Sequence, residues 1–226
     1  MPANMPEKIS VMITGATGAA GSGVLHACLE HPAVEKITVL TRRSIGRTHE
    51  KLAEIIHDDF LDYSGIETGL TGHDACFWCL GVSQMKVRKE EDYHRITYDF
   101  AIEAARVLEK LNPGMTFCFL SGMGTDETQK SRLMWARIKG KAEKDLGNFD
   151  FRLYHFRPGF IHPVKGHTSG SVLGNILYPF IKNSARLCVE ADEFGLAMIN
   201  AALSGYEKHT LENADIRGLA GRKGRK

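Results

Sequence analysis

Three glycines, Gly15, Gly18 and Gly21, follow one another at three-residue intervals near the start of the chain. Residues 9–13 before them are typical of a buried strand, and residues 22–29 after them are typical of a helix. Glycine triplets also occur in plain loops, but one between a strand and a helix is typical of a turn that binds a dinucleotide pyrophosphate. Gly15 would allow the tight turn, Gly18 the close approach of backbone N–H groups, and Gly21 the packing of the helix on the sheet.

The backbone of this turn is what would contact the phosphates. Unpaired N–H groups at a helix start, together with the positive end of the helix dipole, favour a bound anion. The residues that we predict to line the phosphates are Gly15, Thr17, Gly18, Ala19, Ala20 and Gly21.

Two arginines stand where a second strand should end. Residues 36–40 are apolar enough for a buried strand, and Arg42 and Arg43 follow them closely. NAD-binding folds place an acidic residue here for the ribose hydroxyls, whereas arginine suits a ribose 2′-phosphate. The pair therefore predicts NADP as the cofactor; the alternative is that both arginines are solvated surface side chains.

Two further segments place candidate cofactor contacts at strand ends. Asp59 and Phe60 follow the predicted strand 53–57, and a carboxylate there can accept a hydrogen bond from an adenine amino group. Leu80 and Gly81 close the next predicted strand. A glycine at that point lets the backbone pass close to a cofactor.

Cys76 and Cys79 have a spacing that also occurs in metal and redox sites. Along a strand, however, this spacing points the two thiols to opposite faces, and no second Cys/His pair stands nearby. The sequence therefore predicts no metal site. The five cysteines, mostly inside apolar runs, resemble reduced core residues and predict a cytoplasmic location.

Strand-like and helix-like segments alternate along the first two thirds of the chain. This alternation predicts the α/β class, with a Rossmann-like, doubly wound sheet of six or more parallel strands covered on both faces. The predicted strands are 9–13, 36–40, 53–57, 75–80, 115–120 and 151–156, and the later predicted helices are 92–111, 131–146 and 194–203.

Length and composition limit the class of protein. The chain has 226 residues, of which 43% are hydrophobic and 25% charged, which suits one soluble globular domain. A net charge of +2 is too small to favour nucleic acid as the main partner. No apolar run is long enough to cross a bilayer, and the N-terminus lacks the apolar core of a signal peptide.

The pattern loosens after residue 160. We expect residues 160–216 to contribute a small cap on the substrate side of the single domain 1–226. Within them, the apolar segment 172–181 is open to three interpretations: a lid on a substrate pocket, a homodimer face, or a contact with a membrane surface. The glycine-rich, basic residues 217–226 are expected to form a flexible tail.

The motifs together resemble the atypical short-chain dehydrogenase/reductase family, in its branch of short NAD(P)H-binding, nucleoside-sugar-epimerase-like and Tat-interacting oxidoreductases. The resemblance covers about residues 8–160. It implies a Rossmann sheet with a C-terminal cap, and oxidoreductase or epimerase-like chemistry on a small carbonyl or hydroxyl substrate. The matching residues are Thr14 to Gly21, Asp59-Phe60, Cys79-Leu80-Gly81, Leu120-Ser121, Lys139 to Glu143 and Phe156 to Gly159, with Pro158 as a further cofactor contact.

The resemblance also implies a catalytic set of Ser and Tyr-x-x-x-Lys, in which this chain departs from the family. Ser121 and Lys139 match the serine beside the reacting oxygen and the lysine that binds the nicotinamide ribose, but Trp135 occupies the tyrosine position. An indole N–H is a donor only and cannot exchange a proton near neutral pH.

Two functions follow from this departure. The first is an NADP-dependent oxidoreductase that takes its proton from water, Tyr98 or His155. The second is a catalytically weak or inactive NADP(H)-binding protein with a regulatory or redox-sensing role. The motifs do not specify a substrate.

Overall fold

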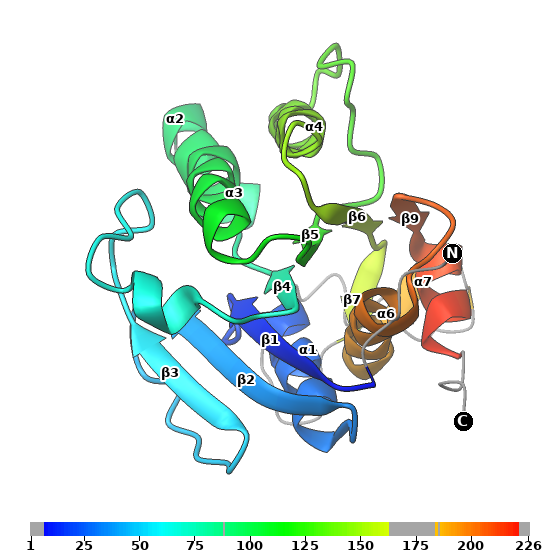
Figure 1. Cartoon of the computed structure of the whole chain (residues 1–226). Helices are drawn as coiled ribbons and strands as arrows, with labels where there is room; N and C mark the ends of the chain where they lie inside the picture. The colour runs from blue at the N-terminus through cyan, green and yellow to red at the C-terminus, as the bar shows by residue number, and fades with distance from the viewer. Residues whose placement is uncertain (1–6, 88, 163–183, 185, 222–226) are drawn as a thin grey trace.

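The structure is a computed structural model that describes residues 7–221 except 88, 163–183 and 185. In this part of the chain, seven parallel strands form one sheet in the order β3-β2-β1-β4-β5-β6-β9 (Figure 1). The strands are β1 (Ile9–Thr14), β2 (Val34–Thr41), β3 (Leu52–Ile56), β4 (Ala75–Trp78), β5 (Thr116–Leu120), β6 (Arg152–Arg157) and β9 (Thr210–Glu212). The predicted fold class and parallel sheet are confirmed.

Helices cover both faces of this sheet. Figure 1 shows α3 and α4 on one side of it and α1 and α6 on the other. The helices are α1 (Ala19–Glu30), α2 (Glu90–His94) with a π-helical turn (Arg95–Asp99), α3 (Phe100–Leu111), α4 (Met134–Leu146), α6 (Ala191–Ser204) and α7 (Asn213–Ala220).

The core consists of two apolar clusters, one on each side of the sheet. Because side chains alternate along a strand, Cys79 joins the cluster under α1 and α6, whereas Cys76 joins the cluster under α3 and α4. The prediction that these two thiols face opposite sides is confirmed. All five cysteines are buried and free.

Glycines allow α1 and α6 to pack closely. A Cβ on Gly23 would lie 2.4 Å from the Cβ of Ala191, and a Cβ on Gly195 would lie 2.7 Å from the Cβ of Ala27. The contact fixes α1, and with it the glycine-rich turn at its start, against the C-terminal part of the chain.

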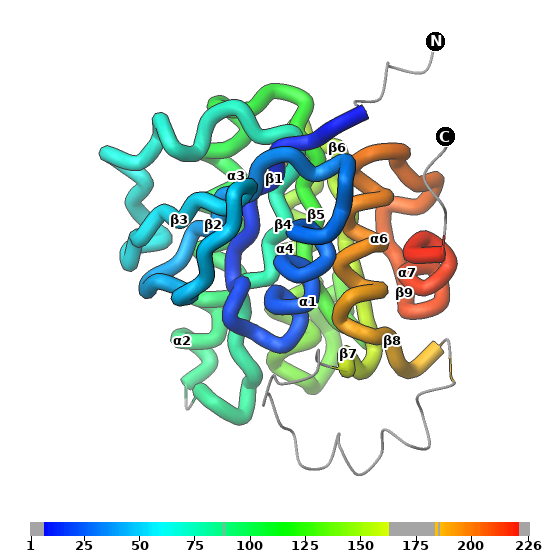
Figure 2. The backbone as a smooth tube through the Cα atoms, turned by 90° about the horizontal axis from the view of Figure 1, so that it is seen from below, coloured from blue at the N-terminus to red at the C-terminus, as the bar shows by residue number. Residues whose placement is uncertain are grey.

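The C-terminal third contains elements that the sequence did not reveal. A second, two-stranded parallel sheet joins β7 (Phe160–His162) to β8 (Cys188–Glu190), and β9 adds to the edge of the main sheet. Within 160–216, α6 and β9 therefore belong to the central fold rather than to a cap. Figure 2 shows β7 and β8 below the N-terminal end of α1.

The basic C-terminal segment begins later than expected. Helix α7 continues to Ala220 and buries Leu219 completely, because this side chain completes the core under α6 and α7. Residues 217–220 are thus helical, and residues 222–226 lie outside the described residues, as does the apolar segment 172–181. No helix in the described ranges combines the length and apolar character needed to span a membrane.

A methyl group at Gly21 should be costly. A Cβ there would lie 2.2 Å from the Gly15 carbonyl oxygen, so Gly21→Ala is expected to lower the free energy of unfolding by about 1–3 kcal/mol. Gly218 in α7 is the matched control, because a Cβ there meets nothing within 4 Å. Gly218→Ala should leave stability unchanged or raise it by up to about 1 kcal/mol through helix propensity. Urea unfolding of both variants checks this, and equal midpoints would contradict it.

Candidate functional site

The glycine-rich turn lies where the strand order reverses, between β1 and β4. Gly15 has φ of +67°, and a Cβ on it would lie 2.4 Å from the Cys79 carbonyl oxygen, so this position requires glycine. Thr14 Oγ1 accepts a hydrogen bond of 3.2 Å from the Leu80 N–H, which ties the ends of the two strands together. In open parallel sheets, ligands bind outside the carboxyl ends of the strands at such a switch point.

Helix α1 starts directly from this turn. Gly18 is its N-cap and supplies no side-chain hydrogen bond to the first turn, while the Gly18 N–H donates to the Gly15 carbonyl at 2.9 Å. Thr17 and Gly18 are exposed, Ala19 is partly exposed, and Ala20 is buried. The backbone N–H groups at the start of α1 thus have no side-chain cap, as the phosphate prediction requires.

The residues predicted to hold the adenosine end follow β2 and β3. Arg42 and Arg43 come immediately after the last residue of β2 and are exposed. Asp59 is exposed, and its carboxylate accepts a hydrogen bond of 3.0 Å from the Leu61 N–H. Phe60 is 1% exposed and its ring stacks on Phe100, so only its backbone is free to face a cofactor.

Leu80 and Gly81 come after β4, next to the glycine turn. Leu80 is half-buried and Gly81 is exposed. A Cβ on Gly81 would meet nothing within 4 Å, so packing within the protein does not require glycine there.

Ser121 follows β5 and is nearly buried, with 5% of its surface exposed. Its N–H donates to the Phe156 carbonyl at 2.8 Å, and its hydroxyl lies 2.9 Å from Thr125 Oγ1. Thr125 was not among the predicted site residues. Its position four residues after Ser121 in an irregular loop carries no sequence signal by which it could be found.

Lys139 reaches from α4 to the same strand end. Its ammonium donates a hydrogen bond of 2.9 Å to the Leu120 carbonyl and lies 5.5 Å from the centroid of the Phe119 ring. Burial lowers the pKa of Lys139 to about 8, against the opposing effects of Glu143 and Cys79. The Lys139 ammonium therefore contacts the last residue of β5, and Ser121 is the next residue in the chain.

Trp135 lies one turn before Lys139 on α4, against the loop that follows Ser121. A Cβ on Gly122 or on Gly124 would each lie 3.6 Å from an atom of the indole ring. Trp135 is half-buried and belongs to neither apolar core cluster. The indole thus lines the loop beside Ser121 rather than filling the interior.

The two other side chains considered as proton sources have different surroundings. Tyr98 donates a hydrogen bond of 2.6 Å to Asp145 and has Lys141 3.7 Å above its ring; burial raises its pKa. His155 is buried, and desolvation lowers its pKa to about 4, so it is neutral near pH 7. No described contact joins either residue to Ser121, Trp135 or Lys139.

A buried ion pair holds α4 against β6 beside the site. Arg157 Nε donates to Glu143 at 3.0 Å, and Arg157 Nη2 donates to Glu127 at 2.6 Å. Pro158 next to it is buried, and its carbonyl accepts from the Met123 N–H at 2.9 Å. Glu143 and Arg157 stood in the matching motifs, but their pairing depends on a contact across 14 residues that no spacing rule indicates.

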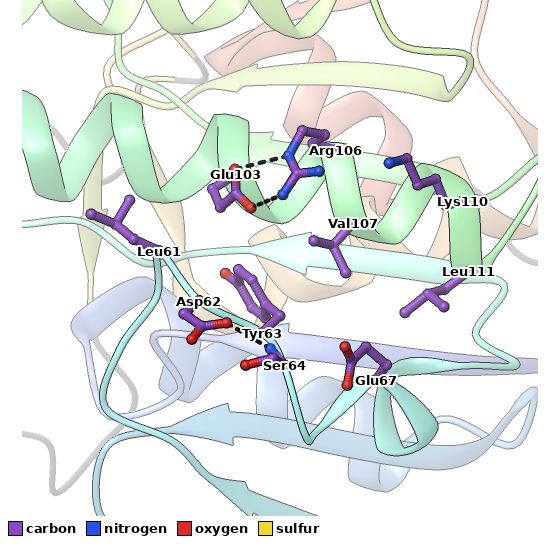
Figure 3. A pocket seen from close by; sticks show the side chains of 10 residues that line it. All are labelled: Leu61, Asp62, Tyr63, Ser64, Glu67, Glu103, Arg106, Val107, Lys110 and Leu111. Carbon is purple, nitrogen blue, oxygen red and sulfur yellow. Dashed lines mark hydrogen bonds and ion pairs between the residues drawn. The ribbon is translucent and has the colours of Figure 1, made fainter.

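Two cavities of about 340 and 350 Å³ lie away from these strand ends. Figure 3 shows the first, between α3 and the segment around Tyr63, where Arg106 points to Glu103 and pairs with it. Of the residues considered for the site, His155 lines the second cavity, and none of the predicted cofactor contacts, Ser121, Trp135 or Lys139 lines either one.

Comparison with known proteins finds several relatives, of which three follow. The leucinostatins biosynthesis cluster protein T of Purpureocillium lilacinum is 30% identical over 64% of this chain and 52% of its own length. HTATIP2 of Rattus norvegicus is 28% identical over 67% of this chain and 62% of its own length. The mitochondrial protein FMP52 of Candida albicans is 26% identical over 77% of this chain and 76% of its own length.

These matches bear on size and location. The chain spans about half of the length of the first of these relatives and less than two thirds of the second. Because FMP52 carries the word mitochondrial in its name, the cytoplasmic location stays a prediction.

Solved structures agree on the fold. The Bordetella bronchiseptica enzyme WbmF, solved in complex with NAD+, matches with a TM-score of 0.67 at 12% identity, over 94% of this chain and 77% of WbmF.

Residues 11–131, more than half of the chain, match the model of the NAD dependent epimerase/dehydratase family. The chain belongs to this family.

Proposed function

We propose that this protein binds NADP(H) along the carboxyl ends of the central strands. The glycine-rich turn at the crossover between β1 and β4 carries this proposal. The family membership and the NAD+ in the WbmF structure support a nicotinamide dinucleotide. The pyrophosphate contacts are Gly15, Thr17, Gly18, Ala19, Ala20 and Gly21, and further contacts are Arg42, Arg43, Asp59, Phe60, Leu80, Gly81, Lys139 and Pro158.

The choice of NADP over NAD rests on this chain's own residues. Two exposed guanidinium groups directly follow β2. A guanidinium holds a phosphate by charge-assisted, bidentate hydrogen bonds, which the ribose hydroxyls of NAD do not provide. The 2′-phosphate therefore lies beside Arg42 and Arg43 in the proposed complex.

Replacing Arg42 and Arg43 together by alanine is expected to lower NADPH affinity roughly tenfold or more, because a hydrogen bond to a charged group contributes about 1.5–3 kcal/mol. NADH affinity should change little. Arg47→Ala, an exposed arginine in the same loop, is the matched control and should leave both affinities unchanged. Calorimetric titration of the three proteins with each cofactor measures these affinities; equal wild-type affinity for the two cofactors would refute the arginine argument.

We further infer that the protein binds the cofactor in a regulatory or redox-sensing role rather than to reduce simple carbonyl compounds. The supporting observation is Trp135, which lines the loop beside Ser121 where a proton-exchanging side chain would be needed. Assay of NADPH consumption over a panel of aldehydes and ketones tests this inference, and binding without turnover supports it.

A second candidate is an oxidoreductase in which Lys139 is the acid. One observation favours it: burial lowers the pKa of Lys139 to about 8, within the range useful for general acid catalysis near neutral pH. Carbonyl reduction by such an enzyme would slow as the pH rises through about 8, because the lysine would lose the proton that it must donate.

A further inference from the structure

The hydroxyl groups of Ser121 and Thr125 share one hydrogen bond whose direction can be deduced. Thr125 Oγ1 lies 2.9 Å from Ser121 Oγ and 2.8 Å from the Gly122 carbonyl oxygen. A carbonyl oxygen can only accept, so Thr125 donates to Gly122. A threonine hydroxyl has one proton, and therefore Ser121 must donate to Thr125.

This direction determines what Ser121 presents to a ligand. With its proton directed at Thr125, Ser121 Oγ keeps its lone pairs and acts as an acceptor. Both hydroxyl-bearing residues are buried, with 5% and 8% of their surfaces exposed, so water cannot readily replace the bond between them. Turning the serine proton toward a ligand would break the hydrogen bond to Thr125.

The neighbouring ammonium uses one of its three protons within the protein. Lys139 donates one proton to the Leu120 carbonyl, the residue before Ser121. A ligand oxygen beside Ser121 thus meets lone pairs on the serine, which repel a carbonyl oxygen and attract an O–H group.

We propose that Thr125 is a positioning residue that makes Ser121 a hydrogen-bond acceptor, so that the site selects an alcohol over the corresponding ketone. The inference rests on the proposed function, which places the ligand of the cofactor-loaded protein beside Ser121. It adds a ligand class, hydroxyl-bearing molecules, and a residue that determines it.

The experiment compares matched pairs, cyclohexanol with cyclohexanone and 1-phenylethanol with acetophenone. Each is titrated into protein loaded with the redox-inert analogue tetrahydro-NADPH, and binding is followed by ligand-observed NMR. The wild type should bind each alcohol roughly two- to tenfold more tightly than its ketone, the value of one hydrogen bond. Thr125→Val, which keeps the shape but frees the Ser121 proton, should abolish or reverse this preference, and Thr125→Ser should retain it.

The outcomes separate this inference from the proposed function. Failure of NADPH itself to bind in a parallel titration would overturn both. If the cofactor binds normally, four results would overturn the role of Thr125 alone. They are equal affinity for both members of each pair, tighter binding of the ketone, no binding of either at the solubility limit, and an alcohol preference that survives Thr125→Val.

Discussion

Trp135→Tyr is expected to create NADPH-dependent reductase activity on some member of a broad carbonyl panel. The introduced phenol would lie one helical turn before Lys139 and beside the loop that follows Ser121. General acid catalysis by a positioned side chain is worth about 10²- to 10⁴-fold in rate. The gain should be visible as NADPH consumption above the slow or absent turnover of the wild type.

A single substitution should suffice, because the phenol itself would supply the hydrogen-bond donor that a carbonyl oxygen needs and that Ser121 does not present. Lys139 already lies at the end of β5, where its ammonium contacts Leu120 and can lower the pKa of a phenol on the preceding turn. The indole is half-buried against Gly122 and Gly124, so a smaller ring fits the same space without a clash.

Two controls make the Trp135→Tyr result interpretable. The gain should vanish in a Lys139→Met background, because nothing would then lower the pKa of the new phenol. Trp135→Phe should remain as slow as the wild type, since it supplies no proton. A wild type that turns over briskly, unchanged by Trp135→Phe and slowing above about pH 8, would contradict this account and identify Lys139 as the acid.

Much of the geometry of the candidate site could be predicted because its parts are local in sequence. The turn from Gly15 to Gly21 follows directly from a strand and starts a helix, so its place at the carboxyl end of β1 follows from the segment alone. Cys76 and Cys79 lie on opposite faces because the side-chain period of a strand determines it. Elements with long apolar runs, such as Ile9–Thr14, can also be predicted from their own residues alone.

What was missed depends on contacts between distant segments. The strands β7, β8 and β9 have three residues each, too few for a periodic pattern to distinguish them from loops. Thr125 contacts Ser121 only because the loop returns its hydroxyl to that side chain. The basic composition after residue 216 suggested a tail, but Leu219 within it is fully buried.

Glu143→Ala is expected to lower the free energy of unfolding by about 3 kcal/mol. The Glu143 side chain is completely buried and forms two hydrogen bonds with Arg157, one of 3.0 Å from Nε and a second from Nη2. Removing one partner of a buried pair typically costs about 3–5 kcal/mol, because the other charge is left without compensation. The lower end applies because Glu127 and Glu212 also contact Arg157.

The Glu143–Arg157 pair is expected to affect the candidate site through α4. Trp135, Lys139 and Glu143 follow one another at four-residue intervals and so share one face of the helix. The Glu143–Arg157 pair fastens that face to the end of β6, next to Pro158. Glu143→Ala should therefore also weaken NADPH binding at temperatures where the protein remains folded.

A more exposed ion pair on α3 is the matched control for Glu143→Ala. Glu103 pairs with Arg106 three residues later, and about half of the Arg106 side chain is exposed. Glu103→Ala should cost at most about 0.5 kcal/mol. Urea unfolding measures both variants, and the double variant Glu143→Met with Arg157→Met should be more stable than Glu143→Ala, because no charge is left uncompensated in the interior. A Glu143→Ala midpoint equal to that of Glu103→Ala would show that the buried pair does not hold α4 to the sheet.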